Sequence, residues 1–182
     1  MSMGKAQFAR IGTAPHGWAY SPAMSERAAN ALEPHARDPL GCQVLGMLTL
    51  RCALAAAALQ DGGAVARWLG EAQALAARVD DDPASAREWF SATNVAIWRL
   101  SLAVEQGESG RVVLELASGA DPAKLSAAVR RTGLYLDVGR GLARDRRTQG
   151  DAASWLYRAE SAAPQFVGNY CPGPRGRLVF AV

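Results

Sequence analysis

The chain has 182 residues, of which 49% are hydrophobic and 20% are charged, and its formal net charge is +3. These values fit one globular domain with its own core and exclude the composition of a disordered or collagen-like chain. The positive excess is small beside that of a dedicated nucleic-acid-binding domain. About a fifth of the residues are alanine, the strongest helix former, so the composition favours an all-α fold.

The first 22 residues lack a hydrophobic period and are rich in glycine, proline and alanine. They are predicted to form a flexible N-terminal arm, and they contain no apolar signal-peptide core. No stretch of the sequence reaches the roughly 18 uninterrupted apolar residues of a membrane span. We therefore expect a cytoplasmic protein without a membrane partner.

After the arm, helix-forming segments alternate with breakers such as DGG, DDDP, GE and SGADP. The predicted helices cover about residues 23–36, 40–60, 64–79, 86–106, 110–117, 123–144 and 150–163. Pro164 stops the last of them, and residues 165–182 are predicted to be an irregular tail. The predicted organisation is thus an arm (1–22), a helical domain (23–164) and a tail (165–182).

The helical segments form long–short pairs that recur along the chain. ALQDGGAVARWLGEAQAL, AVEQGESGRVVLELAS and ARDRRTQGDAASWLYRAESA each join the end of a long helix, a glycine-containing turn and a shorter amphipathic helix. Ala72, Ala117 and Ala159 take corresponding positions, 45 and 42 residues apart. Periods of this size with two helices per unit are typical of α-solenoids. The alternative is a compact helical bundle with accidental internal similarity.

Two of the predicted helices indicate where the core lies. The helix over 64–79 has one apolar face at i, i+3, i+4 and i+7 spacing, made of Val65, Trp68, Leu69, Ala72, Leu75, Ala76 and Val79. The segment 40–60 is almost wholly apolar, so we expect Cys42 and Cys52 to be buried thiols. This segment needs cover from the helix over 23–36, from a second copy or from both, which leaves a homodimer open.

Four blocks carry a family resemblance: LGMLTLRCALAAAALQDG, WFSATNVAIWRLSLAVEQGESGRVVLELA, LYLDVGRGLARD and DAASWLYRAESAAP. They resemble the C-terminal tetratricopeptide-like (TPR-like) domain of actinobacterial helix-turn-helix transcriptional regulators, over about residues 31–164. The resemblance implies a short right-handed α-solenoid of about three TPR-like helical hairpins. It also implies a non-enzymatic binding or regulatory module that takes a peptide, a partner protein or a small-molecule ligand in its concave groove. The residues before the first long helix are too few for a helix-turn-helix domain, so we expect no direct DNA binding.

The helix over 86–106 carries a polar line of Asn94, Trp98 and Ser101 on one narrow arc. Asparagine offers a donor and an acceptor to a peptide backbone, and tryptophan offers a flat apolar face with one N–H. Because the first helices of TPR hairpins line the concave groove, this line is a candidate ligand contact. The alternative is an ordinary exposed face on which Asn94 makes local backbone bonds.

The helix over 123–144 carries a matching charged line of Arg130, Asp137, Arg140 and Arg144. Asp137 and Arg140 are three residues apart and can pair. The other arginines leave net positive charge, which suits a carboxylate or a phosphate. The predicted ligand-binding groove therefore consists of Asn94, Trp98, Ser101, Asp137 and Arg140. The alternative for this line is a solvated charged face.

Signals of catalysis are thin. The only histidines are His16 and His35, and neither stands at metal-ligand spacing from a cysteine or a second histidine. The sequence contains no G-x-S-x-G, P-loop or G-x-G-x-x-G motif. We therefore expect no catalytic residues, no metal and no cofactor. The rival hypothesis is a stand-alone accessory protein or enzyme of a biosynthetic pathway that uses the same groove as a substrate pocket. A third is a truncated remnant without an independent function.

Overall fold

The computed structural model describes residues 17–80, 90–125 and 128–165, and all regular elements within these ranges are helices. The α-helices are α2 (Gly17–Leu32), α3 (Pro39–Ala58), α4 (Gly62–Ala76), α5 (Ala92–Gln106), α6 (Arg111–Ser118), α7 (Ala128–Ala143) and α8 (Gln149–Ala162). Two short 3-10 turns, η1 (Glu33–His35) and η2 (Pro122–Lys124), lie between them. The predicted all-α class is confirmed for this part of the chain.

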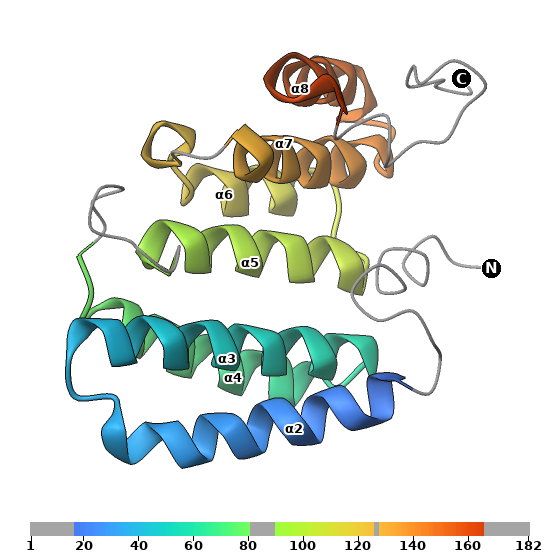
Figure 1. Ribbon diagram of the computed structural model, residues 1–182. Helices are drawn as coiled ribbons and strands as arrows, with labels where there is room; N and C mark the ends of the chain where they lie inside the picture. The colour runs from blue at the N-terminus through green and yellow to red at the C-terminus, as the bar shows by residue number, and fades with distance from the viewer. Residues whose placement is uncertain (1–16, 81–89, 126–127, 166–182) are drawn as a thin grey trace. The chain divides into compact units, whose positions relative to one another are not determined.

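The chain divides into two compact units, Met1–Gln106 and Gly107–Val182. The first unit contains α2, α3, α4 and α5, and the second contains α6, α7 and α8 (Figure 1).

One predicted boundary is wrong. Helix α2 begins at Gly17, so residues 17–22, which were predicted to belong to the flexible arm, are helical. The sequence signal for the arm included Pro22, which is the sixth residue of α2. Residues 1–16, with His16, and residues 166–182, with Cys171, lie outside the described ranges.

Local capping explains where α3 and α4 begin. The carboxylate of Asp38 accepts a hydrogen bond from the Gly41 N–H at 2.7 Å, and Pro39 occupies the first position of α3. Asp61 accepts from the Ala64 N–H at 2.9 Å in the same way. The DGG segment that predicted a break therefore also starts the next helix.

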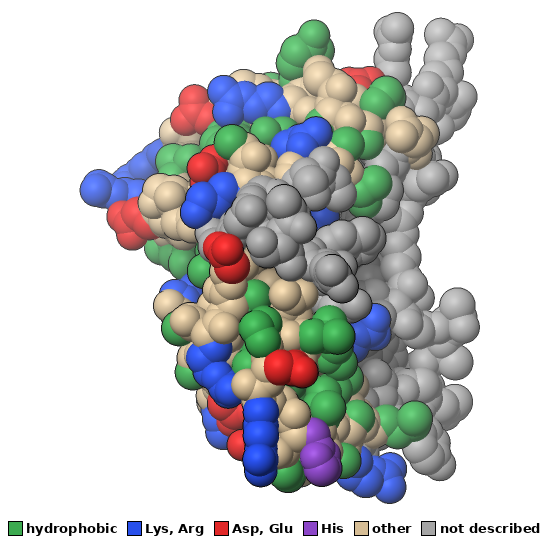
Figure 2. All heavy atoms as spheres, turned by 60° about the vertical axis from the view of Figure 1, so that its left-hand side comes forward, with side chains coloured by type: hydrophobic (Ala, Val, Ile, Leu, Met, Phe, Trp, Pro, Cys, Tyr) green, Lys and Arg blue, Asp and Glu red, His purple; other side chains and the backbone are tan. Residues whose placement is uncertain are grey.

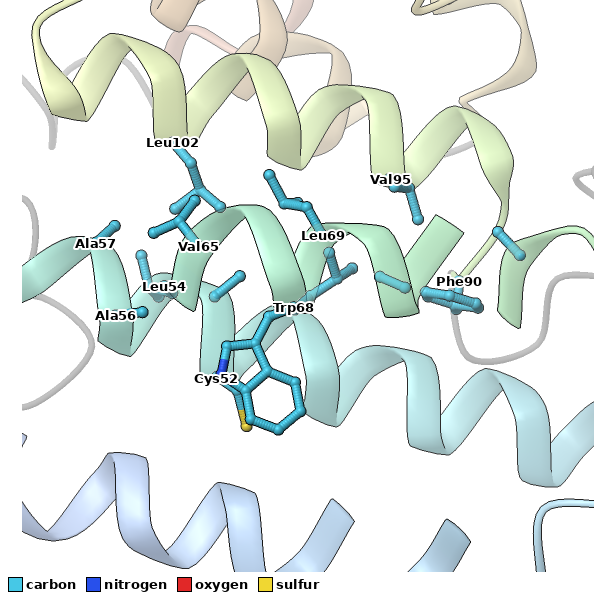
Figure 3. Packing of buried hydrophobic residues seen from close by; sticks show 14 residues of the cluster. Cys52, Leu54, Ala56, Ala57, Val65, Trp68, Leu69, Phe90, Val95 and Leu102 are labelled. Carbon is cyan, nitrogen blue, oxygen red and sulfur yellow. The ribbon is translucent and has the colours of Figure 1, made fainter. Parts of the chain in front are cut away.

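Helix α3 is the centre of the first unit. It packs against α2, α4 and α5 and has buried residues on most of its circumference, while Arg51 is exposed. The cluster around it includes Leu50, Trp68, Leu69, Phe90 and Leu102 (Figure 3). The expected cover of this apolar segment thus comes from the same chain, while Leu40 and Val44 near its start stay exposed. Cys42 and Cys52 are buried, as predicted.

Among the described helices, α3 is also the one that has the length and apolarity of a membrane span, with a mean hydropathy of 1.5 over its best window. Within the protein, 61% of that window is buried. A core helix of a soluble protein passes the same test, so this helix is weak evidence for a membrane.

In the second unit, α7 packs against α8 on one side and contacts α6 on another (Figure 1). A Cβ added to Gly139 would lie 2.5 Å from Leu156 Cγ, so this glycine sets the close approach of α7 and α8. The N–H of Gly110 donates to the Gly141 carbonyl at 3.3 Å, next to the start of α6. Gly110 has a φ of 59°, a value that favours glycine. Gly139 therefore serves the packing of α7 against α8.

Candidate functional site

One candidate site is a face of α7 together with Arg144, which directly follows the helix, and we call it the α7 line. It consists of Arg130, Gly133, Asp137, Arg140 and Arg144. The steps between these residues are three, four, three and four, a spacing that keeps them on one side of a helix. They all belong to the second unit.

Asp137 and Arg140 form the ion pair that their spacing predicted. Arg140 Nη1 lies 3.1 Å from Asp137 Oδ1, with both a hydrogen bond and opposite charges. The Asp137 side chain is 10% exposed and the Arg140 side chain is 25% exposed. A carboxylate buried this far from water holds the guanidinium in a defined orientation, because the pair is screened less than an exposed one.

Gly133 leaves open space on the same face. A Cβ added at this position would meet no atom within 4 Å, in contrast to Gly139 on the packed side of the helix. Val129, one turn before Gly133, is 48% exposed. Between Arg130 and the Asp137–Arg140 pair, the α7 line therefore has an uncharged position without a side chain, Gly133, with the apolar Val129 next to it.

Arg130 stands at the first turn of α7 and is half-buried. Burial lowers the pKa of Arg130 below its ordinary value, because the charged guanidinium loses hydration. A partly dehydrated cation interacts more strongly with an incoming anion than a fully hydrated one.

The predicted line on α5 is placed differently. Asn94 is 2% exposed, and its Nδ2 lies 3.7 Å from Met47 Sδ on α3. Its backbone N–H donates to Ser91 Oγ at 3.3 Å, a local capping bond. Trp98 packs against the core cluster of the first unit, and it and Ser101 are half-buried. The structure therefore places Asn94 inside the first unit and leaves Trp98 and Ser101 at its surface.

The two predicted lines belong to different units, since Asn94, Trp98 and Ser101 lie in the first and Asp137 and Arg140 in the second. Each line is a candidate on its own. The groove that would combine them stays a prediction.

An aromatic cluster between α7 and α8 was missed from the sequence. The ring centroids of Tyr135 and Trp155 are 5.8 Å apart, and the Arg158 guanidinium lies 4.9 Å from the Trp155 ring centroid. Tyr157 on the same helix is 71% exposed. The three-residue step from Trp155 to Arg158 was the available signal, because it places the two side chains on one helix face.

The remaining cysteine and histidine side chains of the described residues give no sign of a catalytic site. Burial of the thiol, with smaller effects of Glu26 and Glu71, raises the pKa of Cys52 to about 11, so the nucleophilic thiolate is disfavoured. His35 is exposed at the end of η1. On the face that Figure 2 shows, acidic and basic side chains are interspersed among hydrophobic ones. No group of three or more His, Cys, Asp or Glu residues that could hold a metal occurs within 17–80, 90–125 and 128–165.

Comparison with protein-family models, with curated proteins and with solved structures finds no match for this chain.

Proposed function

We propose that the chain is a non-enzymatic, TPR-like binding module. In this proposal a peptide, a partner protein or a small-molecule ligand binds in the concave groove, which the first helix of each hairpin lines. In this proposal its helices form a short right-handed α-solenoid of about three hairpins, similar to the sensor end of actinobacterial transcriptional regulators. It would act in the cytoplasm through a partner, without contacting DNA itself.

The observation that carries the proposal is the α7 line. The pair of Asp137 and Arg140 is held at 3.1 Å with the carboxylate buried, next to open space at Gly133. An oriented guanidinium beside an uncrowded helix face is suited to recognising a ligand carboxylate or carbonyl.

The packing within each unit supports the repeat part of the proposal. Helices α3 and α4 pack extensively against each other in the first unit, and α7 and α8 do so in the second. In both pairs a long helix is joined to a shorter one by a tight turn. Packed helix pairs of this kind are the units that helical-repeat proteins stack.

Native mass spectrometry of the protein purified from its own host tests the proposal, because it reports bound small molecules, bound proteins and subunit count together. We expect a retained ligand or partner that is lost in Arg140→Gln and kept in Arg146→Gln. Arg146 is a matched control: it is an exposed arginine of the same unit, outside the α7 line. Trp98→Ala tests the line on α5 in the same way.

A chain that retains nothing, as wild type and as variants, would overturn the proposal. A retained molecule that the wild-type protein converts to a new product would also overturn it, in favour of an enzyme of a biosynthetic pathway.

A further inference from the structure

We infer that Trp155 and Arg158 on α8 form a docking surface for a segment of a partner protein that carries an acidic side chain beside an apolar one. The inference goes beyond the proposed function, because α8 is the second helix of its pair, whereas first helices line the proposed groove. It concerns the second unit alone, since α7 and α8 both belong to it.

The internal repeat makes α8 comparable with α4. The segments WLGEA on α4 and WLYRA on α8 correspond, because Ala72 and Ala159 take the same place in the repeat. Both segments begin with a tryptophan, but their fourth residues have opposite charges, Glu71 on α4 and Arg158 on α8. The two helices therefore present the same aromatic ring next to different charges.

On α4 the groups around the tryptophan find their partners within the helix and the core. Arg67 lies over the Trp68 ring, with its Cζ 4.3 Å from the ring centroid. Glu71 stands one turn after Arg67, and its Oε1 is 3.8 Å from Arg67 Nη1. Trp68 itself is 6% exposed and belongs to the core of the first unit. The cation on the ring thus has a carboxylate from its own helix.

On α8 the cation on the ring has no carboxylate of its own. The Arg158 Cζ lies 4.9 Å from the Trp155 ring centroid. The residue four positions after the arginine, which is Glu71 on α4, is Ala162 on α8. Within 17–80, 90–125 and 128–165, the exposed Arg158 makes neither a hydrogen bond nor an ion pair. Its N–H donors are therefore open to a carboxylate, which a guanidinium binds in two-point geometry.

The ring beside Arg158 supplies an apolar contact and a further donor. The ring centroids of Trp155 and Tyr135 are 5.8 Å apart, and both residues are half-buried, so part of this aromatic pair is open to solvent. The Trp155 indole N–H makes no hydrogen bond among the described residues. Tryptophan, tyrosine and arginine dominate the binding energy of many protein interfaces. An apolar side chain next to the acidic one can pack on this aromatic pair.

The charge of α8 favours a single carboxylate over a nucleic-acid strand. Arg158 is the one basic residue of this helix, which also carries Asp151 and Glu160. A nucleic-acid strand binds by neutralising several phosphates with several cations, and its other phosphates would meet these acidic groups. One acidic side chain of a protein needs only one guanidinium.

The test is an NMR titration of the isotopically labelled protein, with the indole N–H of Trp155 as the reporter, assigned by Trp155→Phe. The probes are capped serine–glycine peptides that contain Phe-Glu, Phe-Gln or Ser-Glu, and a single-stranded oligonucleotide. We expect the Phe-Glu peptide to shift the Trp155 resonance and to bind about tenfold more tightly than the Phe-Gln peptide. The Ser-Glu peptide should bind more weakly, because it lacks the apolar contact.

Substitutions at Arg158 test the charge of the surface. Arg158→Gln should remove the preference for glutamate over glutamine in the peptide. Arg146→Gln, the same loss of charge at another exposed arginine of this unit, should keep the preference. Arg158→Glu should favour a Phe-Lys peptide instead, so a gain of binding guards against a merely unfolded variant.

Ala162→Glu tests the comparison with α4, because it adds within α8 the carboxylate that Glu71 supplies to Arg67. The added carboxylate should compete for Arg158 and weaken binding of the Phe-Glu peptide by about twofold or more. Ala162→Gln, which adds a side chain of the same size without the charge, should leave binding unchanged. Circular dichroism confirms that each variant is folded.

Equal binding of the Phe-Glu and Phe-Gln peptides would overturn the inference, as would an Arg146→Gln variant that loses the preference, because both mean unselective attraction. Tighter binding of the oligonucleotide through Arg158 would reassign the surface to nucleic acid. Peptide binding that is lost in Arg158→Gln and kept in Arg140→Gln supports a surface separate from the proposed groove. The reverse pattern would assign the peptide to the α7 line and overturn the inference about α8.

Discussion

The ring of Phe90 lies directly against the backbone of Gly46: a Cβ added to Gly46 would be 2.1 Å from Phe90 Cζ. Phe90 is fully buried and stands just before α5, while Gly46 lies in the first half of α3. The missing side chain of one residue is thus the space that the other occupies. This contact fixes the start of α5 on α3 within the first unit.

We expect Gly46→Ala to destabilise the protein. The methyl group would overlap the Phe90 ring in a packed core, and such overpacking typically costs about 1–3 kcal/mol. Gly70→Ala on α4 is the control, because a Cβ there meets no atom within 4 Å. It should stabilise the helix by about 0.5–1 kcal/mol through helix propensity. Urea denaturation measures both, and equal effects would show that the contact with Phe90 is not tight.

A second substitution tests the same contact from the other side. In a Phe90→Leu background, Gly46→Ala should cost less than it does in the wild-type protein, because the smaller side chain can make room. A double-mutant cycle measures the difference as a coupling energy. Additive effects would mean that Gly46→Ala acts elsewhere in α3.

Gly139→Ala and Gly133→Ala make a matched pair on one helix. A Cβ at Gly139 would meet Leu156 Cγ at 2.5 Å, whereas one at Gly133 would meet nothing within 4 Å. We expect Gly139→Ala to lower the free energy of unfolding by about 1–3 kcal/mol and Gly133→Ala to raise it by about 0.5–1 kcal/mol. Opposite signs in thermal or urea unfolding check the orientation of α7 against α8, and a stabilising Gly139→Ala would contradict it.

The ion pair of Asp137 and Arg140 should contribute more than that of Arg111 and Glu115. The two pairs have the same N–O distance of 3.1 Å, but the side chains of the second are 89% and 66% exposed. Exposed pairs on a helix contribute about 0.3–0.5 kcal/mol. We expect double-mutant cycles with alanine to give a clearly larger coupling for the buried pair. Increasing salt should reduce the coupling of the exposed pair first, because its charges are better screened. Equal couplings would contradict the buried geometry.

The Cys52 thiol should make stability fall in alkali. Burial raises the pKa of Cys52 from 9.0 to about 11 in the folded protein, so between these values the unfolded chain loses the proton and the folded chain keeps it. The free energy of unfolding then decreases as pH rises through this window, and the contribution of the thiol is fully present below it. Cys52→Ala should show a shallower decrease over the same range. Parallel pH profiles in urea denaturation would exclude this thiol as a source of the dependence.

Much of the helical structure could be predicted because it depends on local signals. The buried positions Val65, Trp68, Leu69 and Ala72 follow from the helical period, and the pairing of Asp137 with Arg140 follows from a three-residue step. Both the burial pattern and the ion pair depend only on residues in neighbouring turns of one helix.

What could not be predicted depends on short turns and on contacts between helices. A continuous helix was expected over 123–144, but the structure has η2, then an extended Leu125, and α7 begins only at Ala128. Asp121 caps η2 by accepting from the Ala123 N–H, an interaction too local to interrupt the hydrophobic period. The burial of Asn94 beside Met47 was missed because it joins α3 to α5, 47 residues apart.

The alanines in the second half of α3 have a consequence for how this protein can evolve. Ala53, Ala55, Ala56 and Ala57 are all buried, whereas the outward positions of α8, such as Ser154 and Tyr157, are open to solvent. At the alanines, natural selection acts on side-chain volume, because any larger group would push neighbouring helices apart. On the outer side of α8, natural selection acts only on solubility and on contacts with other molecules. Relatives of this protein should therefore keep small residues along that half of α3 and diverge most quickly along α8.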